Sequence, residues 1–106
     1  MKIVINVCYG GFSLSEEATK FFNLDSVYSD IDRQDPMLIE KVKENPKWVS
    51  GSFANLKVVD IPDEATDWVI DEYDGLERIV YVFNGKINYV HWGAVQYEER
   101  RTSNEG

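Results

Sequence analysis

The residues best suited to bind a ligand form a paired-glycine loop, Tyr9–Ser13, which follows an apolar run and precedes a helix start. Glycine lets a ligand approach backbone N–H groups closely, and such groups at a helix start attract anions. We therefore consider a nucleotide signal as the ligand of a five-residue loop: Tyr9, Gly10, Gly11, Phe12 and Ser13. Glu16 and Glu17 would repel its phosphates, and the loop lacks a P-loop lysine, so a tight turn between strand and helix is the alternative.

Two further sets of residues have the types that catalysis or metal binding requires. Cys8 and His91 could form a nucleophile–base pair, although a thiol at the end of an apolar strand is ordinary in a protein core. Asp30, Asp32 and Asp35 could hold a hard cation, but Asp35 is better explained as a helix cap, and no EF-hand glycine follows. The sequence thus assigns no catalytic residue, no metal ligand and no cofactor.

The acidic balance of the chain bears on its partners. A formal net charge of −8 repels phosphate backbones, which argues against direct nucleic-acid binding. The same charge favours a basic protein surface, including one that normally holds nucleic acid, although solubility alone also explains it. The candidate interaction residues are acidic groups of one predicted hairpin and two aromatic residues near the end of the chain: Asp71, Glu72, Asp74, Glu77, Trp92 and Tyr97.

The elements that position the glycine loop are a strand and a helix. The nearly continuous apolar run 2–8 predicts an interior strand. Ser13 or Ser15 then caps the first helix, and Ser13 with Glu16 has the spacing of a capping box. The segment 26–31 is predicted as a short strand.

The middle of the chain predicts a second helix and another strand. Asp35 is a good N-cap, Pro36 suits the first helical position, and the pair Asn45-Pro46 ends the helix. Residues 48–55 are interpreted as a loop or short strand, and residues 56–61 as a strand that stops at a proline.

The C-terminal half predicts an antiparallel meander of three strands, 68–73, 76–83 and 86–92. Asp74-Gly75 and Asn84-Gly85 separate them, and each pair is typical of a type I′ hairpin turn. Two-residue turns fix the register and place apolar residues on both faces. The pairs that follow are Tyr73 with Leu76, Asp71 with Arg78, Val69 with Val80, Phe83 with Lys86, and Ile79 with Val90.

One face of this meander lacks an obvious cover. Its members are predicted to be Val69, Tyr73, Leu76, Val80, Val82, Ile87 and Tyr89. Since two short helices can cover only the opposite face, a second subunit is expected here, most simply in a two-fold homodimer.

These elements predict one α+β domain over residues 1–97, with a polar tail at 98–106. Its fold is a mixed, largely antiparallel twisted sheet of about five or six strands, with two helices on one face and a C-terminal meander. A single cysteine fits a reducing compartment, and neither a signal peptide nor a membrane span is evident. We expect a host-cell cytoplasmic protein with no membrane partner.

Three segments together resemble a family of small proteins encoded by bacteriophages and prophages. They are Met1-Lys-Ile-Val-Ile-Asn6 with Cys8-Tyr-Gly-Gly-Phe-Ser-Leu-Ser15, then Asp32-Arg-Gln-Asp-Pro36, then Leu56-Lys-Val-Val-Asp-Ile-Pro-Asp63 with Ile70-Asp-Glu-Tyr-Asp-Gly75. Beyond Glu77 the chain departs from the family by adding the second hairpin and a longer end. The family has no established activity, so the resemblance implies viral origin and gives no residue a role.

Viral origin, acidity and abundant aromatic residues lead to one expected function. We expect a non-enzymatic phage accessory protein that inhibits a host antiviral defence system by binding a host protein. One alternative is a small protein that sequesters a nucleotide signal through the glycine loop. A weaker alternative is a small metal-dependent nuclease or hydrolase that uses the aspartates.

Overall fold

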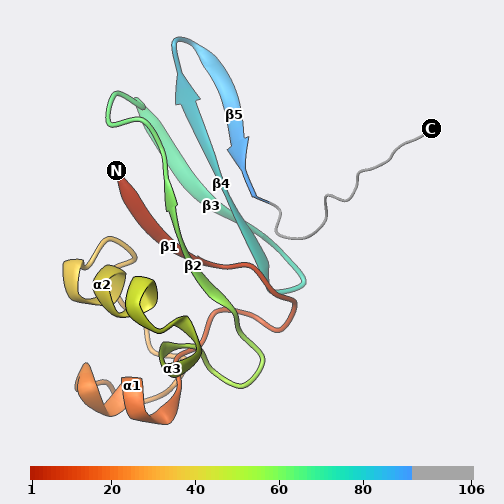
Figure 1. Ribbon diagram of the computed structural model, residues 1–106. Coiled ribbons are helices and arrows are strands. Elements are labelled where there is room, and N and C mark those ends of the chain that lie inside the picture. The colour runs from red at the N-terminus through yellow and green to blue at the C-terminus, as the bar shows by residue number, and fades with distance from the viewer. Residues whose placement is uncertain (92–106) are drawn as a thin grey trace.

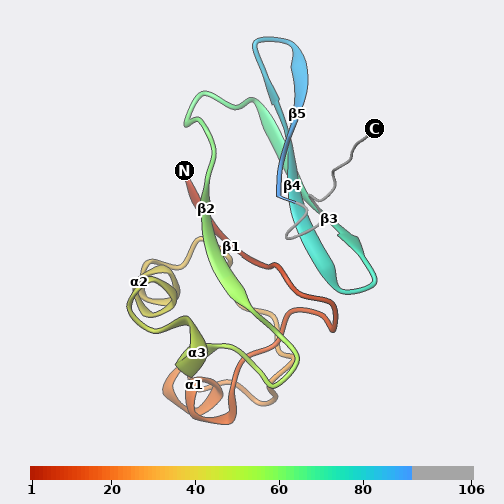
Figure 2. The ribbon, with the colours of Figure 1, turned by 45° about the vertical axis from the view of Figure 1, so that its right-hand side comes forward.

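The computed structural model describes residues 1–91, which form three layers (Figures 1 and 2). Helices make the first layer, a two-stranded antiparallel sheet the second, and a three-stranded antiparallel sheet the third. The α+β class is therefore confirmed. The elements, in chain order, are β1 (Lys2–Asn6), α1 (Glu16–Phe21), α2 (Pro36–Glu44), α3 (Pro46–Val49), β2 (Leu56–Asp60), β3 (Asp67–Tyr73), β4 (Leu76–Phe83) and β5 (Lys86–Val90).

The middle layer consists of β1 and β2, which run antiparallel with Lys2 opposite Asp60 and Asn6 opposite Leu56. Ile3, Val4 and Ile5 are fully buried, which confirms the interior strand that the apolar run predicts. Alternate residues of a strand point to opposite faces. Accordingly, Val4 packs among the helices while Ile3 and Ile5 pack toward the three-stranded sheet.

The first helix begins later than a capping box at Ser13 would place it. Ser15 is the N-cap, because its hydroxyl accepts a hydrogen bond from the Ala18 amide at 3.0 Å. Before it, Leu14 forms an isolated antiparallel bridge with Ser50, and that extended backbone keeps Ser13 outside the helix. The capping box of Ser13 with Glu16 was therefore a wrong prediction.

The strand predicted at 26–31 is also absent from the structure. The Ser26 carbonyl accepts from the Ser29 amide at 3.0 Å, and the Ser29 hydroxyl accepts from the Ser26 amide. These local bonds close the backbone into a turn. Serine side chains compete in this way with the ladder bonds that a strand needs.

The second helix forms as its sequence signals predict, and a short third helix follows it. Asp35 Oδ1 accepts from the amides of Met37 and Leu38, and Pro36 occupies the first turn. Asn45 ends α2 and caps α3, since its side chain accepts from the Trp48 amide at 3.2 Å. The segment 48–55 was predicted as a loop or strand, so the helical turn before Ser50 is a correction.

The meander is confirmed in its turns and in the register of its strands, but β5 ends at Val90, before the predicted strand end at residue 92, which lies outside the described residues. All five predicted residue pairs are cross-strand partners in the structure. Asp74, Gly75, Asn84 and Gly85 all have positive φ, between 53° and 88°, as a type I′ turn requires at both central positions.

The prediction of one sheet of five or six strands, with two helices on one face, is wrong. The described residues form two separate sheets stacked face to face, with α2 and α3 against the outer side of β1 and β2 and with α1 packed on α3 (Figure 2). Ile79 of β4 packs with Ile3, Ile5, Val59 and Ile61 between the sheets. Because β1 and β2 are apolar on both faces, they are stabilised as a central layer rather than as an extension of the meander.

Candidate functional site

The glycine loop packs against the first hairpin turn of the meander. The Gly10 amide donates to the Asp74 carbonyl at 3.4 Å, and a Cβ on Gly75 would collide with the backbone nitrogens of Gly10 and Gly11. A shallow hollow beside this contact is lined by the loop glycines, Gly75 and the carboxylates of Glu72 and Asp74. This arrangement supports the interpretation of the loop as a packing turn, since carboxylates would repel a phosphate.

The five predicted ligand-binding residues do not form one site. Tyr9 is exposed, and the Phe12 ring lies 3.6 Å from the Arg33 guanidinium carbon. Gly11 borders the hollow at the hairpin. Of the five, only Gly10 and Ser13 line the larger pocket described next.

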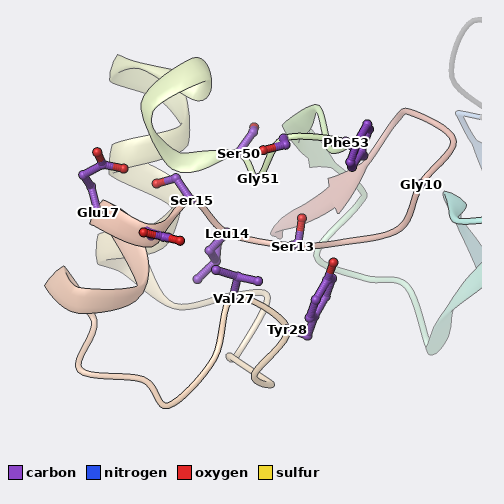
Figure 3. A pocket seen from close by; sticks show the side chains of 12 residues that line it. Gly10, Ser13, Leu14, Ser15, Glu17, Val27, Tyr28, Ser50, Gly51 and Phe53 are labelled. Carbon is purple, nitrogen blue, oxygen red and sulfur yellow. The ribbon is translucent and has the colours of Figure 1, made fainter.

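This pocket, here called the α1 pocket, has a volume of about 410 Å³ and lies between the start of α1 and the loop that follows α3 (Figure 3). Its lining combines carboxylates, hydroxyl groups and two aromatic rings, and includes Ser13, Glu16, Glu17, Tyr28, Ser50 and Phe53. Sequence reasoning missed Tyr28, Ser50 and Phe53, because only the tertiary fold brings their segments beside α1. The serine and aromatic content of 48–55 is the one signal that could have drawn attention to them.

Glu77, predicted as part of an acidic surface, is instead an interior residue with 6% exposure. Its carboxylate accepts from the Arg33 guanidinium at both oxygens, at 2.8 and 3.1 Å, and from the backbone amide of Asn6 at 2.9 Å. The side-chain amide of Asn6 in turn donates to the Gly75 carbonyl. This polar network joins the middle layer to the meander, so Glu77 is not available to a partner.

The other residues of the acidic hairpin divide into two kinds. Asp71 forms an ion pair with Arg78 at 2.9 Å, whereas Glu72 and Asp74 are exposed at the turn. Glu72 and Glu77 are directly opposed, as the register predicts, but each carboxylate has its own donor, since Glu72 accepts from the Gly75 amide. The remaining predicted interaction residues, Trp92 and Tyr97, and the predicted tail at 98–106 lie outside the described residues.

Figure 2 shows the meander with one face toward the middle layer and the other face away from it. Apolar side chains are exposed on the face away from the middle layer. The most exposed members are Val69 at 56%, Tyr73 at 65%, Ile87 at 64% and Tyr89 at 59%. Leu76 was predicted here but is buried. We call this surface the outer face; its members are Val69, Tyr73, Val80, Val82, Ile87 and Tyr89. No described element covers it.

The remaining candidates for chemistry have separate surroundings. The Cys8 thiol donates to the Tyr9 carbonyl at 3.3 Å. His91 follows β5, where burial lowers its pKa and the charge of Lys57 lowers it further. Continuing the predicted register by one residue past Val90 would place His91 opposite Arg78, but the β4–β5 ladder ends at Ile79 and Val90, and His91 has a positive φ of 58°.

The three aspartates proposed for a cation also have separate positions. Asp35 caps α2, Asp32 accepts from the Gln34 amide at 2.9 Å, and Asp30 is exposed. Among residues 1–91 no group of three or more histidine, cysteine or acidic side chains is arranged to hold a metal ion.

None of the helices within residues 1–91 combines the length and the apolar character needed to cross a membrane. Comparison of the chain with protein-family models, with curated proteins and with solved structures finds no match.

Proposed function

We propose that this chain is a phage-encoded accessory protein that inhibits a host antiviral defence system by binding a host protein, without catalysing a reaction. The observation that carries the proposal is the outer face of the meander. The sequence resemblance to phage and prophage proteins supports the viral origin, and the net charge of −8 supports a basic partner.

The outer face has the composition of a protein-binding surface. Four of its side chains are more than half exposed, and two of them are tyrosines, which combine a large apolar ring with a hydroxyl that can remain hydrated. Sheets normally cover at least one face, and exposed apolar surface is typical of interaction sites. The Asp71–Arg78 ion pair lies on the same face between Val69 and Tyr73, and the Arg78 guanidinium carbon is 4.4 Å from the centre of the Tyr89 ring. A partner that buries this face would remove these rings from water.

The charges around the outer face indicate the chemistry of the partner. Glu72 and Asp74 are exposed at the turn that ends β3, and Asp67 is exposed where β3 begins. A host protein with an apolar centre and a basic rim would match this arrangement. Long-range attraction to such a rim would raise the association rate.

The alternative of a nucleotide-sequestering protein receives less support from the site. Glu16 and Glu17 line the α1 pocket, and Glu72 and Asp74 line the hollow at the glycine loop. Each carboxylate opposes a phosphate in the place where the nucleotide would have to bind.

A plating assay with matched variants tests the proposal. The protein is expressed in host strains that each carry one defence system, and the plating efficiency of a sensitive phage is measured. We expect the wild-type chain to restore plating in one strain, and Ile87→Gln with Tyr89→Gln to reduce that effect at least tenfold. The control, Met37→Gln with Tyr9→Gln, changes one aliphatic and one aromatic residue that are exposed elsewhere and leaves the charge unaltered. Full inhibitory activity of the outer-face variant would refute the proposal.

Sedimentation velocity on the pure protein tests the competing occupant of the outer face, a second copy of this chain. The proposal expects the wild-type chain and the outer-face variant to sediment alike. A wild-type dimer that the outer-face substitutions convert to monomer would assign the face to self-association instead.

A further inference from the structure

The described residues that line the α1 pocket include the carboxylates of Glu16 and Glu17 and no basic side chain, so the pocket is negatively charged. Glu16 and Glu17 are both exposed, and neither forms an ion pair with a described residue. The positive end of α1 amounts to only about half an elementary charge, so the two carboxylates outweigh it. The pocket therefore attracts a cation.

Two aromatic rings at the pocket are exposed far beyond what packing requires. Tyr28 and Phe53 are 73% and 74% exposed, and Figure 3 shows them on either side of Ser13. A ring presents a negative face on which a guanidinium group can stack, and arginine does so more often than lysine. Such stacking would also remove part of the ring surface from water.

The pocket also contains a buried hydroxyl that has no hydrogen-bond partner within residues 1–91. Ser13 is only 6% exposed, lines the pocket, and its side chain makes no hydrogen bond to any of the described residues. A Cβ at position 51 would collide with the Ser13 hydroxyl, so the absence of a side chain at Gly51 leaves space for this oxygen. Buried hydroxyls nearly always have a partner, and here an N–H group entering the pocket could supply it.

From these features we propose that the α1 pocket binds an arginine side chain presented by a partner protein. Glu16 and Glu17 supply the countercharge, Tyr28 and Phe53 the stacking surfaces, and the Ser13 hydroxyl an acceptor for one N–H. The volume of about 410 Å³ lies in the range of roughly 300–1,000 Å³ usual for ligand sites. The inference rests on the proposed function in taking the arginine from a protein, but the site is separate from the outer face.

A blocked arginine peptide tests the pocket without the host partner, so its failure is distinguishable from that of the proposed function. Chemical shifts of the full chain are followed by NMR during titration with acetyl-arginine amide at low salt. We expect saturable shifts at the amides of Ser13, Gly51 and Phe53. The citrulline peptide, which has the same shape without the charge, should bind at least about tenfold more weakly.

Variants locate the interaction. Each of Glu16→Gln and Glu17→Gln should weaken binding about fivefold, whereas Glu40→Gln and Glu64→Gln, exposed acidic residues outside the pocket, should leave it within about twofold. Tyr28→Leu changes an exposed side chain and should weaken binding several-fold without altering the melting temperature. Equal binding of the citrulline and arginine peptides, or equal effects of pocket and control substitutions, would overturn the inference. Preferential binding of a nucleotide in this pocket would do so as well.

Discussion

Replacing Glu77 by glutamine should destabilise the fold far more than any other single loss of a carboxylate in the hairpin. Glutamine retains the shape of the glutamate side chain and an oxygen that can accept from the backbone amide of Asn6, but it leaves Arg33 without its bidentate carboxylate partner. Removing one member of a buried ion pair costs roughly 3–5 kcal/mol. The Arg33 side chain is 22% exposed and still donates to the Val4 carbonyl, so we expect a loss of about 2–3 kcal/mol.

Urea unfolding followed by tryptophan fluorescence measures this loss. A domain of this size has a total stability of about 5–15 kcal/mol, so the midpoint should fall by about 1–2 M urea. Glu72→Gln is the matched control, since Glu72 lies directly opposite on β3 but is exposed, and its loss should stay below about 0.5 kcal/mol.

A double variant separates the ion pair from other effects of the substitution. Arg33→Met added to Glu77→Gln removes the unpartnered charge while the acceptor for Asn6 remains, so more than half of the lost stability should return. The reasoning is refuted if Glu77→Gln is no more destabilising than Glu72→Gln, or if the double variant is less stable than the single one.

Two further predictions concern the hairpin turns and the histidine. In urea unfolding, Gly75→Ala should cost at least about 2 kcal/mol of stability, because φ at this position is +88° and a Cβ would collide with the glycine loop. Gly85→Ala, at a φ of +73° and in open space, should cost about 1 kcal/mol. Equal losses for the two variants would contradict the close packing of Gly75 against the glycine loop. His91 should titrate below 6.5 by NMR, and Lys57→Met should raise its pKa. At a pH between the folded and unfolded pKa values of His91, the unfolded chain binds more protons than the folded chain. The stability that neutral His91 contributes is therefore fully present above pH 6.5 and is lost as the pH falls through the folded pKa. A folded value at or above 6.5 would contradict this.

Short residue patterns correctly predicted the elements whose geometry depends on residues close together in the sequence. Asp74-Gly75 and Asn84-Gly85 fixed both hairpins and their register as far as Ile79 and Val90, since a two-residue turn leaves no freedom of alignment. Asp35-Pro36 likewise placed the start of α2. Where two signals competed, as with Ser13 and Ser15 at α1, the choice depended on a distant contact, the bridge from Leu14 to Ser50.

The arrangement of the sheets and the candidate sites could not be derived in this way. An apolar strand such as β1 can lie in the middle of one sheet or between two layers, and periodicity does not distinguish these cases. The same limit applies to Glu77. From the sequence it is indistinguishable from an exposed acidic residue of the hairpin, and only the tertiary fold shows that it forms an ion pair with Arg33. The α1 pocket collects residues from three separate segments, so no local spacing reveals it.

The pairing of β1 with β2 has a consequence for how the chain reaches its native state. Lys2 and Asp60 are 58 positions apart, whereas Asp71 and Arg78 in the first hairpin are only 7 apart. Closing the longer loop costs more chain entropy, so the meander is expected to form early and the central layer late. During synthesis β1 leaves the ribosome before β2, and it has no strand partner until β2 follows. Until then the apolar side chains of Ile3, Val4 and Ile5 stay exposed, and this interval is when the nascent chain is most prone to aggregate.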